Sequence, residues 1–139
     1  MSTEITREQL ISEARSWLGT PFHHQGRVKG AGVDCVGVLV KTLSIFNLLT
    51  VDNTNYSRNP NGDYLIRMCE LYFNPIPMDE ILPGDILVFA WGKEPQHLAL
   101  YTDIGILHAH VRVKKVVEHI YDDPWKKRTV AAYRIKGIK

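Results

Sequence analysis

The chain has 139 residues, a length that suits one domain over residues 1–139 with a sizeable core. Apolar residues make up 45% and charged residues 23%, ordinary values for a globular protein. The formal net charge of +2 is too small to indicate nucleic acid, although it would suit an anionic polymer. No apolar stretch is long enough to span a membrane, and the first residues lack a signal-peptide pattern. We therefore expect cytoplasmic synthesis and neither a membrane nor a nucleic-acid partner.

A first helix is predicted close to the N-terminus. Thr6 and Gln9 form a capping-box pattern, and apolar residues follow at helical spacing. Gly19 stands where a helix is expected to end, with Pro21 just beyond it.

Two further helices are predicted after a glycine-rich loop over residues 20–33. Asp34 can cap a second helix that runs to about Phe46 and is apolar on every side, so we expect it to be buried. Residues 53–63 are rich in Asn, Pro and Gly and indicate a surface loop. Residues 64–73 are consistent with a third helix.

The second half of the chain predicts strands. Short runs rich in β-branched and aromatic residues are separated by turn signals, and they cover residues 86–91, 97–102, 106–113, 116–121 and 130–135. Helices followed by strands favour an α+β fold, with the N-terminal helices packed on a mostly antiparallel sheet of about five strands.

Cys35 is the first candidate for catalysis. It follows Asp34 at a predicted loop-to-helix junction, where the helix dipole and a nearby imidazolium can lower a thiol pKa and supply thiolate at neutral pH. Nearby glycines leave the sulfur uncovered, and Gly37 offers a small surface that a substrate could approach. The alternative is a buried helix cysteine, the interpretation we prefer for Cys69.

Histidines on the predicted strands could supply a base. His97 opens one strand, from which it could project over a helix end within hydrogen-bonding reach of Cys35; the alternative is a surface histidine. His108, on the next strand, could orient the base, and His110 shares its face and competes with it. His119 is expected to face solvent.

A metal site is not favoured. His23 and His24 precede Cys35 by about a dozen residues, a spacing unlike the paired ligands of a zinc site. We therefore expect no metal and no cofactor.

Several motifs occur together in the order of one known family. The runs of residues 17–22 and 32–37 resemble the NlpC family pattern of Trp, Gly, Pro and Tyr followed by Asp-Cys-Ser-Gly. Residues 82–89 resemble that family's Pro-Gly-Asp-Leu strand, residues 97–101 its His-Val-Gly-Ile-Tyr strand, and residues 107–109 its Ile-His-Ala segment.

This resemblance implies a papain-like α+β fold and a thiol protease with Cys35, His97 and His108 as its catalytic residues. It implies hydrolysis of peptidoglycan stem peptides, commonly between D-glutamate and a diamino acid, so peptidoglycan is the expected partner. The variants at Phe22–Gln25 and Asp34–Gly37 are most similar to the phage-tail and gene-transfer-agent branch. We therefore expect incorporation into a phage or phage-like tail and contact with tail-tip proteins.

Two departures from the family pattern concern substrate contacts. The family's tyrosine is Phe22 here, so His23, His24, Gln25 or helix-start amides would have to support the oxyanion. The serine after the nucleophile is Val36. The substrate-binding candidates are Phe22, His23, His24, Asp34, Val36 and Gly37.

Two rival functions remain open. A structural tail-assembly protein with a vestigial peptidase site is favoured by Phe22 and Val36. An acyltransferase or deamidase on the same fold is the other rival, although acyltransferase relatives usually place the histidine before the cysteine.

Overall fold

The helices lie where the sequence predicts them, with one addition. The structure, a computed structural model, describes residues 4–54, 56 and 64–139, so most of the predicted 53–63 loop lies outside the described residues. The principal helices are α1 (Arg7–Arg15), α2 (Cys35–Ser44) and α3 (Tyr64–Tyr72), with a short 3-10 turn η1 (Met78–Glu80) and a short helix α4 (Asp123–Arg128).

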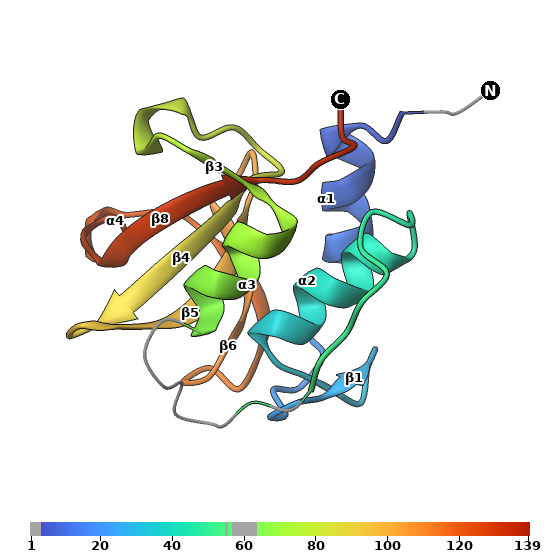
Figure 1. Cartoon of the computed structure of the whole chain (residues 1–139). Helices are drawn as coiled ribbons and strands as arrows, with labels where there is room; N and C mark the ends of the chain where they lie inside the picture. Colours follow the sequence, from blue (N-terminus) through green and yellow to red (C-terminus); the bar gives the residue numbers. More distant parts are fainter. Residues whose placement is uncertain (1–3, 55, 57–63) are drawn as a thin grey trace.

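The strands form an antiparallel sheet of six strands in the order β3-β8-β4-β5-β6-β7, and a small β1-β2 pair (Figure 1). Their bounds are β1 (Arg27–Val28), β2 (Gly32–Val33), β3 (Asn74–Ile76), β4 (Ile86–Trp91), β5 (Glu94–Tyr101), β6 (Ile106–His110), β7 (Lys115–His119) and β8 (Thr129–Arg134). The predicted α+β class with a mostly antiparallel sheet is confirmed, although the sheet has one strand more than expected.

Each face of the sheet has its own apolar cluster. Leu98, Leu100 and Leu107 point towards the helices α1 to α3 and join the larger core with Val36 and Leu43. The opposite face carries a smaller cluster around Phe89 and Ile106, which Trp125 of α4 helps to cover. Successive residues of β5 and β6 therefore face either the helix side or the α4 side.

Local capping signals are confirmed at the two predicted N-termini. The Thr6 hydroxyl accepts from the Gln9 amide at 3.0 Å while the Gln9 side chain accepts from the Thr6 amide at 2.8 Å. Asp34 caps α2 by a single bond, in which its carboxylate accepts from the Gly37 amide. These bonds satisfy amides that the helices leave unpaired, which fixes where each helix begins.

Besides the small β1-β2 pair and the turn η1, the sequence analysis missed the helix α4 and the strand β3. One of the turn signals between the predicted strands, at residues 122–124, instead marks the start of α4, because a proline in the first turn is compatible with a helix too short to show periodicity. Strand β3 contains Pro75 and lies at the edge of the sheet, the place where a residue without an N–H group is tolerated.

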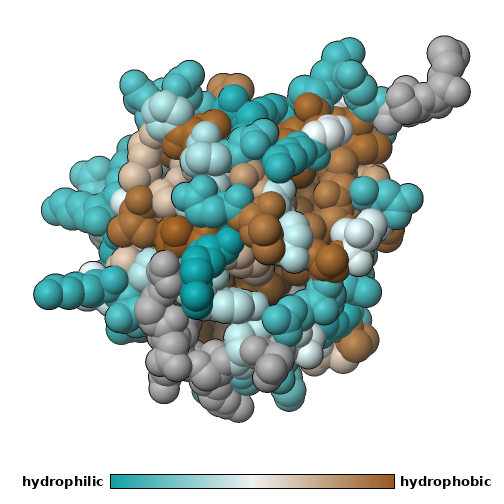
Figure 2. Space-filling view, in the orientation of Figure 1, coloured by the Kyte–Doolittle hydropathy of each residue, from teal (hydrophilic) through white to brown (hydrophobic). Residues whose placement is uncertain are grey.

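The surface over the helices is partly apolar. Figure 2 shows brown, hydrophobic atoms there among teal, hydrophilic ones, and a groove lies between α2 and α3 with Leu39, Tyr64 and Leu71 in its lining. Within the described part of the chain, no helix is long and apolar enough to cross a membrane.

Candidate active site

Cys35 is the first residue of α2, immediately after the capping residue. The Asp34 carboxylate accepts from the Gly37 amide at 2.8 Å, and the Asp34 carbonyl accepts from the Val38 amide at 3.1 Å. The amides of Cys35 and Val36 are instead directed at the sulfur. The positive end of the helix dipole therefore points at Cys35.

The strands β5 and β6 separate beside this sulfur. Their pairing ends at Leu100 and Leu107, so the more N-terminal part of β5 has no partner in β6. The Leu98 amide is directed instead at Cys35. The nucleophile candidate thus lies against the opening between two strands of the sheet.

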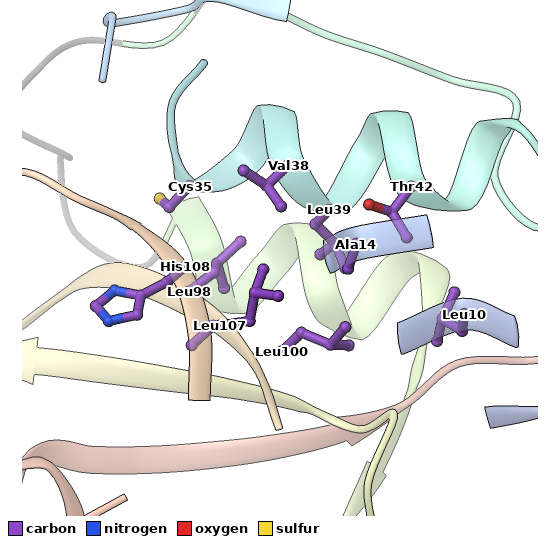
Figure 3. Close-up of a pocket in the computed structure, with 11 residues that line it drawn as sticks. Leu10, Ala14, Cys35, Val38, Leu39, Thr42, Leu98, Leu100, Leu107 and His108 are labelled. Atoms are coloured by element: carbon purple, nitrogen blue, oxygen red, sulfur yellow. The ribbon is translucent and has the colours of Figure 1, made fainter. Parts of the chain in front are cut away.

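A narrow pocket connects this opening with the core. In Figure 3, Cys35 and His108 lie towards one end of the pocket, and Leu10 and Thr42 lie towards the other. Cys35 and His108 therefore lie together near the start of α2, whereas the rest of the lining is apolar except for the Thr42 hydroxyl at the far end.

His97 and His108 meet across the strand opening. His97 Nε2 lies 2.6 Å from His108 Nδ1, and the ring centroids are 4.8 Å apart. The register of the two strands, continued past its last pair, would set His97 opposite His110. His97 contacts His108 instead, because His108 is its diagonal neighbour and comes within reach where the two strands separate.

The sequence analysis placed His97 at the start of its strand, but in the structure His97 lies within β5. The strand begins at Glu94 after a tight turn in which Gly92 has a φ of 68°, and a bulge interrupts its pairing with β4 between Phe89 and Ala90. Among the described residues, no hydrogen bond joins the Cys35 sulfur to His97, so the predicted contact between them stays a prediction. Such bonds are often long in a free enzyme.

A third histidine extends the contact. His108 Nε2 lies 2.8 Å from His119 Nε2, and His119 Nδ1 lies 3.0 Å from the carbonyl oxygen of Ile120. His108 is opposite Val117 in the β6–β7 ladder, which makes His119 its diagonal neighbour on the same face. The expectation that His119 faces solvent is wrong: it is half-buried and hydrogen-bonded.

Trp125 of α4 covers these imidazoles. Its ring centroid lies 4.9 Å from that of His108, 5.5 Å from that of His119 and 6.2 Å from that of His97. His110 also contacts the indole, but its Nδ1 accepts from the Arg112 amide at 3.2 Å. The sequence analysis missed Trp125, because no local motif indicates that α4 folds over these strands.

Burial favours the neutral forms of His97, His108 and the Cys35 thiol. It lowers the pKa of His97 to about 3, with a smaller contribution from His110, and it also lowers the pKa of His108. Burial raises the pKa of the Cys35 thiol to about 12, Asp34 adds to this, and nearby backbone amides oppose it. Desolvation therefore favours a neutral thiol over the resting thiolate expected from the helix start and an imidazolium, and that expectation stays a prediction.

The Asp34 carboxylate is buried and fully engaged. Besides Gly37, it accepts from the Gln25 amide at 2.8 Å, from Arg27 at 3.1 Å and from the Tyr56 hydroxyl. Arg27 also donates to Tyr56 at 3.0 Å. Asp34 thus holds the loop against the helix start, and the sequence analysis missed its partners Arg27 and Tyr56.

The other loop residues predicted to bind substrate lie near this network. Phe22 is half-buried against the core, and its amide donates to the Lys114 carbonyl at 2.8 Å. His23 is exposed and donates through Nδ1 to the His24 carbonyl at 3.0 Å, while the His24 ring meets Tyr56 edge-on at 5.5 Å. These contacts leave their roles towards a substrate as predictions.

Two predicted substrate contacts on α2 are buried. Val36 is 3% exposed and belongs to the core. A Cβ atom added at Gly37 would lie 2.5 Å from the Gly26 carbonyl oxygen, so the glycine is required for close packing against the loop. The expectation of an open surface at Gly37 is wrong, and side-chain contact between Val36 and a substrate is not supported.

The remaining cysteine belongs to helix α3. Cys69 is fully buried on the core side of α3, in agreement with its structural interpretation. Within residues 4–54, 56 and 64–139, no group of three or more His, Cys, Asp or Glu side chains could hold a metal ion.

Comparison with known proteins identifies the family. The NlpC/P60 family model matches residues 19–134, so the chain belongs to that family. A curated relative from Escherichia coli strain K12, described as probable endopeptidase NlpC, is 28% identical over 133 residues, covering 91% of this chain and 76% of its own.

Solved structures show the same fold. The NlpC/p60 domain of the peptidoglycan hydrolase SagA superposes with a TM-score of 0.69 at 17% identity, covering 94% of this chain and 100% of that one. The peptidoglycan hydrolase RipB from Mycobacterium tuberculosis gives a TM-score of 0.67 at 22% identity, covering 93% and 64%.

Proposed function

We propose that this protein is a cysteine endopeptidase that hydrolyses peptidoglycan stem peptides, with Cys35 as nucleophile, His97 as general base and His108 as the residue that orients the base. The observation that carries the proposal is the position of Cys35 at the start of α2, against the strand opening that His97 and His108 bridge. Family membership and the descriptions of the relatives support peptidoglycan as the substrate class.

Acylation starts from a neutral thiol and a neutral imidazole. His97 takes the thiol proton as the Cys35 sulfur forms a bond to the scissile carbonyl carbon, which gives a tetrahedral oxyanion. When the oxyanion collapses, the carbon–nitrogen bond breaks and the leaving amine receives the proton from His97. The product amine departs and a thioester remains on Cys35.

Deacylation repeats these roles with water. His97 takes a proton from water as the water oxygen attacks the thioester carbonyl, and the carbon–sulfur bond then breaks. The sulfur regains the proton from His97, and the carboxylic acid product leaves. No cofactor enters the balance of either step.

Backbone amides at the start of α2 can stabilise the oxyanion. The amides of Gly37 and Val38 are bonded to Asp34, whereas those of Cys35 and Val36 are directed at the sulfur and so lie near the reacting carbon. Donors fixed by a helix need no rearrangement when charge develops. This assignment does not depend on the tyrosine that Phe22 replaces.

For the bond cleaved, we propose the link between γ-D-glutamate and the diamino acid, on the strength of the family resemblance. The test is mass spectrometry of muropeptides after incubation with the protein. Cleavage should give a product that starts at the diamino acid, and Cys35→Ala should lower turnover by at least about 10⁴-fold with an unchanged fold.

Cys69→Ala is the matched control, because it also removes a thiol but from the buried side of α3. Activity retained in Cys35→Ala would refute the nucleophile. Intact muropeptides with wild-type protein would favour a tail protein with a vestigial site, and acyl transfer to an added amine would favour the acyltransferase.

For location, we propose incorporation into a phage or phage-like tail, supported by the resemblance of residues 22–25 and 34–37 to that branch. Proteomic mass spectrometry of purified particles from the producing strain tests this. Recovery of the chain with tail-tip proteins is expected, and its absence from intact particles would refute the placement.

A further inference from the structure

A histidine chain leads away from the proposed base and ends on a backbone carbonyl. It runs from His97 through His108 to His119 with nitrogen–nitrogen distances of 2.6 and 2.8 Å, and His119 Nδ1 lies 3.0 Å from the Ile120 oxygen. Each intermediate contact joins two ring nitrogens, either of which could donate. Only the last contact has a fixed direction, because a carbonyl oxygen can only accept.

The carbonyl therefore sets the direction of every bond in the chain. His119 must donate through Nδ1, so in its neutral form Nε2 is an acceptor. His108 must then donate through Nε2, which leaves His108 Nδ1 as the acceptor for His97. His97 in turn donates through Nε2, and its Nδ1 keeps a free lone pair.

This argument requires neutral rings, and burial favours the neutral form at His97 and His108. His108 is 1% exposed, and the pKa values of His97 and His108 are both lowered, mainly by desolvation. The Trp125 indole also lies against all three rings. If one of these hydrogen bonds were reversed, the neighbouring contact would place two donors or two acceptors opposite one another.

We propose that His119 is a positioning residue of this site. The Ile120 carbonyl holds His119 in one tautomer, and His119 in turn fixes the tautomer of His108. His108 then fixes the tautomer of His97 in which Nδ1 can accept a proton. The role of His119 in turnover rests on the proposed function. The tautomers themselves do not, since they follow from hydrogen-bond contacts that exist without substrate.

The decisive experiment is ¹⁵N NMR of the histidine rings in the full-length protein, where protonated and unprotonated ring nitrogens have well-separated chemical shifts. Wild type should show unprotonated nitrogens at His97 Nδ1, His108 Nδ1 and His119 Nε2. His119→Leu removes the acceptor and should give mixed tautomers at His108 and His97. His119→Gln offers a carbonyl oxygen to His108 Nε2 and should restore the wild-type pattern.

Glu118→Gln is the matched control on the same strand. Glu118 bonds to Arg15 and Thr102 and not to the histidines, so this change perturbs β7 without altering the hydrogen bonds of the histidine chain. It should leave the tautomers unchanged. An unprotonated His108 Nε2 in wild type, or unchanged tautomers in His119→Leu, would overturn the proposal.

Muropeptide kinetics give a second measurement. His119→Leu should lower kcat about tenfold with KM nearly unchanged, and His119→Gln should recover most of the loss. Full activity in His119→Leu would overturn the positioning role. If wild type cleaves no muropeptide while the tautomers behave as described, the proposed function fails and the assignment of His119 stands.

Discussion

The two polar networks that flank the start of α2 differ in charge. On the loop side, the Asp34 carboxylate is compensated by Arg27, by Tyr56 and by backbone amides. On the strand side, burial keeps His97 and His108 neutral. A compensated buried charge can hold the helix start in place, but its lone pairs are already engaged. A neutral imidazole chain keeps one lone pair available, which a general base requires.

The largest effect is expected from breaking the neutral network. His108→Ala removes the partner that orients His97 and should lower kcat by about 10³-fold, because the base then samples unproductive tautomers. His110→Ala is the matched control, since His110 lies on the same strand but has no hydrogen bond to His97 among the described residues. Muropeptide kinetics measure both, and the assignment fails if His110→Ala is the inactive variant.

Breaking the charged network should act on stability. Asp34→Ala removes the cap of α2 and leaves Arg27, whose side chain is 12% exposed, without its buried partner. We expect a loss of about 3 kcal/mol in the free energy of unfolding, measured by urea denaturation. Asp52→Ala removes the other, more exposed carboxylate of Arg27 and should cost less than about 1 kcal/mol. Equal losses would show that Asp34 has no special role.

Acid should weaken the neutral network. In the unfolded chain a histidine binds a proton near pH 6.5, whereas the folded pKa of His97 is about 3 and that of His108 is also lowered. The unfolded state therefore binds more protons as the pH falls below 6.5, and stability is lost. The loss should approach about 1.4 kcal/mol per pH unit for each buried imidazole.

Urea denaturation at several pH values between 7 and 5 measures this slope. The double variant His97→Gln/His108→Gln should flatten it, because glutamine does not titrate. An unchanged slope in the double variant would show that other groups cause the acid sensitivity.

The smallest effect concerns the thiol between the two networks. Because burial raises the pKa of Cys35 to about 12, alkylation by iodoacetamide should be slow at pH 7 and rise about tenfold per pH unit up to pH 9. A Cys69→Ala background isolates the Cys35 signal. A rate already constant below pH 7 would reveal a resting thiolate and contradict the neutral pair.

The sequence by itself determined the features that depend on near neighbours along the chain. The Thr6 capping box, the Asp34 cap and therefore the helix-start position of Cys35 follow from side chains that bond amides a few residues away. The strands after Pro75 follow from short-range composition and turn signals. Motif order also indicated the family, because those motifs lie within single elements.

Only the tertiary structure decided how distant segments meet. The separation of β5 and β6 selects His108 over His110, and α4 brings Trp125 over the histidines, yet neither leaves a local pattern in the sequence. His119 joins the histidine chain, and Gly37 packs against Gly26, because segments far apart in the sequence come together in the fold. Capping bonds act over one helical turn. Desolvation and contacts between strands depend instead on every segment that packs over a side chain. The protonation states of the side chains at this site are therefore set by the assembled fold.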